Sequence, residues 1–478
     1  MMMESDLHVH NVSNNSLHSV RVTTDFPNSS HSTLSSYVLQ PTSRTEGDEA
    51  EDKLSALPDD ILIDIAGRLD DLRSTIRLGA LSKRWRHIPR SLPVVKIDVC
   101  DICPPSRNNP LAHRYTLDKK LTAHAAATAW LLSPATQTQR TIRKLYLGVY
   151  LVDPYLQSVG RAVEDFVAAR GGGSLEDLQF TVQPASAAAD IDKDGAVFGQ
   201  RFMSFFDACP VAFKCLTCLD LKKILLQRIG HPCSARRLHT IELVNVPRLE
   251  QLKCYQWCGD DLPMRFGYVP CLELVAVSSS CFDWQEPFNL SEWLANCGNL
   301  YNLSLDFQDE KIWVKPEGPG QLSRIFSNLR VVSLLNISHD CDFDWTLYVL
   351  EAAPSITKFC IKMSWHTCGR NKCEDSADKT NVSWQTSKFQ CPNLTLLQIE
   401  GFAVEKKAME YVRLVIKHAP SLKRIRLIKQ RPDERCDSIY CQHRSPTRLK
   451  FPVRQRENDM IRERLTDGLS SSVKISME

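Results

Sequence analysis

The sequence has no run of about 18 apolar residues, the length a helix needs to cross a bilayer. Its first residues, MMMESDLHVHNV, lack the basic start and apolar core of a secretory signal. The net charge is only +3 over 478 residues, so overall charge does not select a class of partner. We therefore expect a chain of the cytoplasm or nucleus without a membrane segment.

Motifs of the common enzyme classes are missing too. The sequence contains no GxxxxGK[ST], GxGxxG or GxSxG, which hold phosphates, dinucleotides or a nucleophilic serine. The paired acids Asp59 and Asp60 are explained by the positive end of a helix dipole. We therefore expect no catalytic residues, no cofactor and no enzyme activity.

Cysteine is abundant, at 18 residues, but its spacing is not that of a zinc site. Two segments carry ligand types without paired CxxC spacing: WHTCGRNKCED, with His366, Cys368 and Cys373, and CDSIYCQH, with Cys436, Cys441 and His443. Cys215 and Cys218 have that spacing but lie on a predicted strand. We expect buried, reduced thiols and no metal site, with a metal-dependent activity at the two segments as the enzyme alternative.

Residues 1–52 contain much Ser, Thr, Asn and His and show no helical or strand period. This composition predicts a disordered tail. The rest of the chain is ordinary for a folded protein, because 43% of all residues are hydrophobic and 24% are charged.

Residues 53–95 predict three short helices. The first runs from about Pro58 to Leu69, the second is LRSTIRLGAL, and the third is SKRWRHI, ended by Pro89. One apolar set follows from this spacing: Leu57, Pro58, Ile61, Leu62, Ile65, Leu69, Leu78, Leu81 and Trp85. About forty residues rarely bury enough surface to be stable alone. Either the rest of this chain or another protein must cover the set.

Residues 96–140 predict a linker with one helix over 111–133. From 141 to 430 an apolar-x-x-apolar-x-apolar pattern recurs. Its matches are IRKLYL (from 142), LEDLQF (175), LTCLDL (216), LHTIEL (238), LELVAV (272), LYNLSL (300), LRVVSL (329), ITKFCI (356), LTLLQI (394) and LKRIRL (422). LEQLKC (249) also fits but follows LHTIEL so closely that we interpret it as an extra turn.

This recurrence is typical of leucine-rich repeats, with several units longer than the usual 20 to 29 residues. Each unit is a short strand and a return segment whose leucines need neighbouring units to cover them. VGRAVEDFVAARGGG, SEWLANCG and KKAMEYVRLVIKHAP predict helices, the last with Met409, Val412, Val415 and Ile416 on one face. The fold class is therefore α/β, a short all-α unit followed by a curved repeat solenoid. An ordinary α/β domain is the alternative.

The last 78 residues carry 18 Lys or Arg against 10 Asp or Glu. We expect residues 431–478 to form a basic C-terminal extension. A nucleic-acid or phosphate contact is one interpretation. Few aromatic residues are interleaved there, so a solvated basic surface is favoured.

LSALPDDILIDIAGRLDDLRSTIRLGALSKRWRHIPRSLPVVKIDV closely resembles a plant F-box, with Leu57-Pro58, Ile61-Leu62, Leu81-Ser82 and Trp85-Arg86 at the motif's positions. Pro89 departs from the pattern, which often has tryptophan there. The downstream repeats resemble those of plant F-box proteins, and residues 390–430 are similar to their FBD region.

The resemblance implies a substrate receptor of a cullin-RING ubiquitin ligase. The apolar set from Leu57 to Trp85 would face an SKP-family adaptor, and through it a cullin, while the repeats would bind a target protein. Other subunits would transfer ubiquitin. A leucine-rich scaffold that binds its partner without degradation is the alternative. The segment around 366–390 and the concave strand faces are the candidates for specificity. A small molecule in the repeat hollow would fit this class, but no residue selects one.

Overall fold

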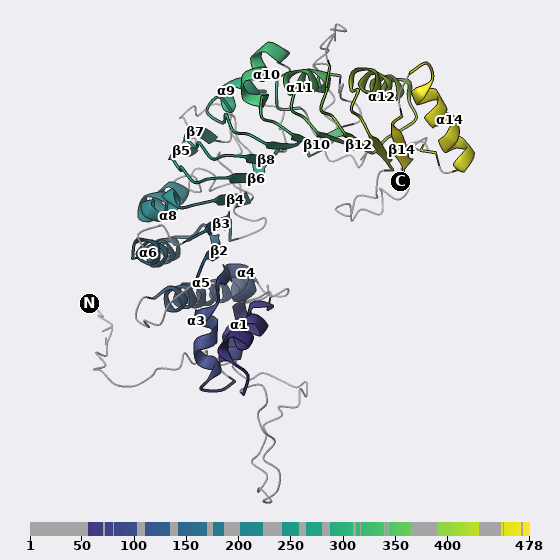
Figure 1. The fold of residues 1–478 in the computed structure, drawn as a ribbon. Helices are drawn as coiled ribbons and strands as arrows, with labels where there is room; N and C mark the ends of the chain where they lie inside the picture. The colour runs from purple at the N-terminus through teal and green to yellow at the C-terminus, as the bar shows by residue number, and fades with distance from the viewer. Residues whose placement is uncertain are drawn as a thin grey trace, which may run out of the picture. The chain divides into compact units, whose positions relative to one another are not determined.

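Figure 1 shows the computed structural model of the chain. The residues that it describes are 56–69, 72–79, 81–102, 110–133, 142–169, 175–185, 201–222, 241–257, 264–279, 287–308, 312–315, 317–338, 341, 344–364, 390–429, 451–452, 454–469 and 472–478. The chain separates into two units, residues 1–52 and 53–478. The predicted disordered tail, the segment around 366–390 and the two cysteine–histidine segments lie outside the described residues.

The N-terminal part of the described chain is helical, as its apolar spacing predicts. It consists of α1 (Asp59–Gly67), α2 (Leu72–Gly79), the 3-10 turn η1 (Trp85–His87) and α3 (Ile88–Ser91). The expected end of the third helix at Pro89 is wrong, because η1 continues into α3 and Pro89 lies in the first turn of α3. Proline fits there, since its fixed φ suits a helix start and its missing N–H has no partner to lose.

The segment expected as a linker contributes to the sheet. β1 (Val94–Asp98) pairs in parallel with β2 (Lys144–Tyr150) and buries Val95 and Ile97. The helices α4 (Val99–Ile102) and α5 (Pro110–Leu132) come between these two strands in sequence, and α5 is the helix predicted over 111–133. The sheet thus begins well before residue 141, because alternate residues of β1 are apolar and reach the same core.

One parallel sheet of twelve strands runs through the described chain, in the order β1-β2-β3-β4-β6-β8-β9-β10-β11-β12-β13-β14. The strands after β2 are β3 (Asp177–Gln183), β4 (Cys218–Lys222), β6 (Gln251–Trp257), β8 (Leu274–Ser279), β9 (Asn302–Asp306), β10 (Val331–Ser338), β11 (Lys358–Ser364), β12 (Leu396–Glu400), β13 (Arg424–Ile428) and β14 (Lys474–Met477). From β2 to β13, each strand of this sheet begins two residues after the first apolar residue of a match to the pattern. Inward leucines such as Leu303 and Leu305 are buried beside Val332 and Leu334 of the next strand.

Helices cover one face of this sheet (Figure 1). They are α6 (Tyr155–Ala168), α8 (Pro210–Lys214), α9 (Leu290–Trp293), α10 (Pro319–Phe326), α11 (Thr346–Ala352) and α12 (Lys406–His418). In α12 the predicted inner face is confirmed, since Met409, Val412, Val415 and Ile416 are all buried. The core lies between these helices and the sheet.

The roles of LHTIEL and LEQLKC are the reverse of the expectation. LEQLKC contributes most of β6, a full strand of the main sheet. The last three residues of LHTIEL begin β5 (Ile241–Asn245), whose one partner among the described strands is β7 (Met264–Tyr268). No match to the sequence pattern predicted β7. Its carbonyls at Met264 and Phe266 accept hydrogen bonds from Trp293 Nε1 at 2.9 Å and Asn296 Nδ2 at 2.6 Å. These side chains cover an otherwise open strand edge.

Asparagine side chains tie successive repeats together just before the strands. Asn299 Nδ2 donates to the Pro270 carbonyl at 2.6 Å, and Asn328 Nδ2 donates to the Gly298 carbonyl at 3.0 Å. Asn393 Nδ2 does the same to the Pro354 carbonyl at 2.9 Å. Each bond satisfies a carbonyl that lies outside the strand ladder.

The C-terminal extension also enters the sheet. β14 pairs in parallel with β13, and α14 (Gln455–Thr466) precedes it with Ile461 and Leu465 buried. Arg413 of α12 donates to the Asp467 carbonyl at 2.9 Å and to the Arg464 carbonyl. The expected end of the repeats at residue 430 is therefore extended by one more helix–strand unit, which closes the open edge of β13.

Candidate partner-binding surfaces

The apolar set predicted to face a partner divides by exposure. Leu62 is 0% exposed and Trp85 3%, and both belong to the core of this chain. Leu57, Ile65, Leu69 and Leu78 are partly buried, whereas Pro58, Ile61 and Leu81 are exposed. The exposed fraction is 43% at Ile61 and 66% at Leu81. The structure therefore leaves fewer apolar side chains exposed than the sequence suggested.

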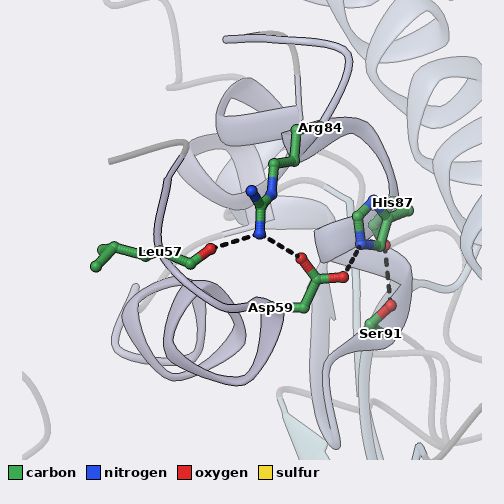
Figure 2. Close-up of polar contacts among 5 residues, drawn as sticks. All are labelled: Leu57, Asp59, Arg84, His87 and Ser91. Atoms are coloured by element: carbon green, nitrogen blue, oxygen red, sulfur yellow. Dashed lines mark hydrogen bonds and ion pairs between the residues drawn. The ribbon is translucent and has the colours of Figure 1, made fainter. Parts of the chain in front are cut away.

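A polar contact joins the start of α1 to η1 (Figure 2). Arg84 Nη2 donates to the Leu57 carbonyl at 2.5 Å and lies 3.3 Å from Asp59 Oδ1, and His87 Nε2 lies 3.0 Å from Asp59 Oδ2. Ser91 Oγ donates to the His87 carbonyl at 3.2 Å. The hydrogen bond from His87, together with Arg84, lowers the pKa of Asp59. These contacts hold Leu57 and Pro58 in place at the edge of the exposed surface.

The sequence alone did not reveal this contact. From the sequence, Asp59 was explained by the helix dipole alone. The partners lie 25 and 28 residues apart, so no helical or strand period relates them.

The helical unit, residues 56–92, shares its core with the sheet. Ile88 and Leu92 are buried in the same apolar cluster as β1 and β2. Arg90 Nη2 donates to the Trp130 carbonyl at 3.2 Å, and its guanidinium carbon lies 4.2 Å from the centre of the Trp130 ring. α2 approaches so closely that a Cβ at Gly79 would lie 3.2 Å from Pro89 Cγ. These contacts fix the orientation of the exposed surface relative to the repeats.

A buried histidine lies where α5 crosses β1. His124 is fully buried, its Nδ1 accepts a hydrogen bond from the Tyr155 hydroxyl at 2.7 Å, and its Nε2 lies 3.5 Å from the Ile97 carbonyl. Burial lowers the pKa of His124 to about 4. The imidazole is therefore neutral at pH 7 and serves as a structural connection between α5, β1 and α6.

The helix-free face of the sheet carries a hollow of about 240 Å³ over β2, β3, β4 and β6. Its lining is polar: Lys144, Glu176, Asp177, Gln179, Thr217, Cys218, Glu250 and Gln251. Asp177 accepts hydrogen bonds from Tyr146 Oη at 3.1 Å and Gln179 Nε2 at 3.0 Å, and from Thr217 Oγ1. Burial raises the pKa of Cys218 to about 11, so its thiol stays protonated at pH 7. The hollow offers hydrogen bonds and negative charge to a ligand.

Most of the described cysteines are buried, as the sequence predicts. All ten described cysteines are free, and seven of them are buried, including Cys215 and Cys218. Within the described ranges, no group of three His, Cys, Asp or Glu residues is placed to hold a metal ion. Among the helices of those ranges, none is both long and apolar enough to cross a membrane.

Comparison with known proteins identifies the repeats. The model of the At1g61320/AtMIF1 family, LRR domain, matches residues 211–477, more than half of the chain. The chain belongs to this family. It is a plant-type leucine-rich-repeat protein, and the large parallel sheet agrees with a solenoid of such repeats. Leucine-rich repeats support a role in protein interaction.

Other comparisons add little. A crystal structure of a Bacteroides fragilis protein is 10% identical, with 75% of this chain and 83% of that chain covered and a TM-score of 0.29. At that score the likeness bears on neither fold nor function. No curated protein matches the chain.

Proposed function

We propose that this protein is a substrate receptor of an SCF-type cullin-RING ubiquitin ligase. The helical unit would act as an F-box that docks on an SKP-family adaptor, and the repeats would bind the target protein. The observation that carries the proposal is the exposure of Pro58, Ile61 and Leu81 on a unit whose buried Leu62, Trp85 and Ile88 belong to the core of the repeats. Apolar side chains left exposed on so small a unit favour a protein contact.

The proposed mechanism is positioning. Trp85, Ile88 and Arg90 connect the helical unit to the sheet, so a target held by the repeats would keep a set orientation toward the adaptor. A rigid connection raises the effective concentration of a target lysine near a charged ubiquitin carrier. Ubiquitin transfer would be done by other subunits, so the proposal assigns this chain no catalytic residue and no cofactor. It places the protein in the cytoplasm or nucleus.

The C-terminal repeats support the resemblance to an FBD region. Within residues 390–430, strand β12, helix α12 and strand β13 follow one another, which is the order of elements in the region that the segment resembles. In the proposal this segment belongs to the target-binding part.

Co-purification with an SKP-family adaptor tests the docking surface. Wild type should retain the adaptor, and Leu81→Asp should lose most of it, because a carboxylate would be desolvated in an apolar contact. Met460→Asp is the matched control, since Met460 is also apolar and exposed, at 57%, but lies on α14. The assignment fails if wild type does not bind the adaptor or if Leu81→Asp binds as well as Met460→Asp.

A non-degradative scaffold is the second candidate. The family match at 211–477 covers repeats and not the helical unit, which favours a function carried by the repeats alone. Affinity capture with the full-length protein and the proteasome inhibited should identify partners that Leu81→Asp still retains, because the repeats are intact in that variant. With the proteasome active, cullin-dependent loss of such a partner supports the receptor, and an unchanged level supports the scaffold.

A further inference from the structure

Two rows of side chains cross the sheet where its strands begin. The first row contains the residue that precedes each strand of the main sheet from β6 to β13. Backbone hydrogen bonds join its members in turn: Glu250, Glu273, Tyr301, Arg330, Thr357, Thr395 and Lys423. The second row is the first residue of each strand from β6 to β14, in register: Gln251, Leu274, Asn302, Val331, Lys358, Leu396, Arg424 and Lys474. We call these two the entry rows.

Charges in the entry rows are sorted by sign. At β6 and β8 the charged members are Glu250 and Glu273, both acidic. From β10 to β14 every charged member is basic: Arg330, Lys358, Lys423, Arg424 and Lys474. All seven are exposed, and none of them forms an ion pair with another residue that the structure describes. Tyr301, 46% exposed, lies between the two groups with the Arg330 guanidinium 5.8 Å from its ring centre.

Farther along β11 to β14 the charges are paired instead. Lys362 Nζ lies 3.6 Å from Glu400 Oε1 across β11 and β12, and Arg426 Nη2 lies 2.5 Å from Glu478 Oε2. Lys362 follows Lys358 by four positions and Arg426 follows Arg424 by two, so each pair of cations shares one face of the sheet. Like charges on neighbouring strands destabilise a sheet. The entry rows therefore carry a repulsion that an oppositely charged ligand would relieve.

We propose that the entry rows bind an extended segment of a partner protein with basic residues at one end, acidic residues at the other and an apolar side chain between them. The basic end would lie over Glu250 and Glu273, the apolar residue on Tyr301, and the acidic end over Lys423, Arg424 and Lys474. The proposal rests on the protein-binding role of the repeats and does not depend on the adaptor.

The geometry sets the length of this segment. From β8 to β13 there are five strand spacings of ~4.8 Å, or ~24 Å. An extended chain advances ~3.4 Å per residue, so about seven residues separate the two charged ends. A nucleic acid fits less well, because Glu250 and Glu273 would repel its phosphates and Tyr301 is the one aromatic member of the entry rows.

Fluorescence anisotropy with synthetic peptides tests the proposal on the full-length protein. The probe is the labelled peptide RRRGLGSGSGEEE, whose leucine lies near the basic end as Tyr301 lies near β8. The control is RERGLGSGSGERE, which has the same composition but a net charge of only one at each end. At low salt the first peptide should bind about tenfold more tightly than the second, and the difference should shrink as added salt screens the charges.

Charge-reversal variants test whether the peptide binds at the entry rows. Lys423→Glu/Arg424→Glu and Glu250→Lys/Glu273→Lys should each weaken binding of the first peptide about tenfold. Arg324→Glu/Lys417→Glu is the matched control for the first variant, because it changes the net charge equally at exposed positions of α10 and α12. It should stay within about twofold of wild type. Thermal melting would show that each variant is folded.

Three results would overturn the proposal: equal binding of both peptides, an equal loss in the helix control, or efficient displacement of the first peptide by a single-stranded oligonucleotide. The adaptor assay separates this inference from the proposed function. Entry-row variants should still retain the adaptor, and Leu81→Asp should still bind the peptide. Adaptor failure with intact peptide binding would count against the ligase proposal alone.

Discussion

The helical unit and the repeat sheet use their apolar residues differently. In the sheet each inward leucine is covered by the strands on either side, as Leu303 and Leu305 are by β8 and β10. The helical unit has no stacked strands that could cover its apolar side chains in this way. It places Leu62 and Trp85 in the shared core and leaves Ile61 and Leu81 exposed. Unpartnered apolar surface therefore remains where the repeat stacking stops.

Trp85→Ala should have the largest effect on stability. Truncating a buried tryptophan costs about 3–5 kcal/mol of unfolding free energy. Trp85 belongs to the same apolar cluster as the sheet, so the whole described region should unfold in one transition at a lower temperature. Calorimetry measures this. A separate early transition for the helical unit, with the main one unchanged, would show that the two regions fold independently.

The exposed side of the same unit supplies the control. Ile61→Ala should change the free energy of unfolding by about 0.5 kcal/mol or less, because surface changes rarely exceed that. The contrast with Trp85→Ala separates stability from docking within one short helical unit.

Acid should weaken the connection between the two regions through His124. The pKa of His124 is lowered from its ordinary 6.5 to about 4 in the folded chain, because burial disfavours the charged imidazole. The unfolded chain binds the proton first as the pH falls, so stability is fully present above pH 6.5 and is lost between pH 6.5 and pH 4. The loss is about 3 kcal/mol.

Urea unfolding at several pH values checks this effect. His124→Phe should remove most of the pH dependence between 6.5 and 4, although it also loses the Tyr155 hydrogen bond and starts from lower stability. An unchanged slope in His124→Phe would mean that other groups cause the acid sensitivity.

Asn328→Ala should have a smaller effect than Trp85→Ala or the protonation of His124, and it concerns only the repeats. It removes the hydrogen bond to the Gly298 carbonyl and should cost about 1 kcal/mol. Asn302→Ala is the matched control, because Asn302 lies on β9 and its side chain makes none of the repeat-to-repeat bonds seen at Asn299, Asn328 and Asn393. Equal losses in urea unfolding would show that the Gly298 bond adds nothing.

Much of the repeat architecture was predictable from local pattern. Strands β2 to β4, β6 and β8 to β13 fall on predicted matches, and α12 buries its predicted face. β1, β7 and β14 were missed. β7 has only five residues and follows no repeat match, whereas β1 and β14 lie in segments assigned to a linker and a tail. Their strand identity depends on a neighbouring strand that is already in place, as β13 is for β14.

The candidate surfaces were only partly predictable. Apolar spacing found the set from Leu57 to Trp85 but could not tell Leu62, which is buried, from Ile61, which is exposed. Both lie on α1, and the distinction comes from which side of the helix meets the rest of the core. The sequence also did not reveal that acidic and basic residues are separated along the entry rows. Glu273 and Lys423 are 150 residues apart and become members of one row only through the strand register.

Hydrophobic period, helix-start residues and the recurrence of one strand pattern are local properties, and they determined the α/β class, the repeats and the helical unit. The tertiary structure decided which apolar residues are covered, which strand joins which sheet, and how the charges line up across it. Burial and strand register arise between segments far apart in sequence. Their free energies therefore depend on neighbouring segments that a local sequence pattern does not identify.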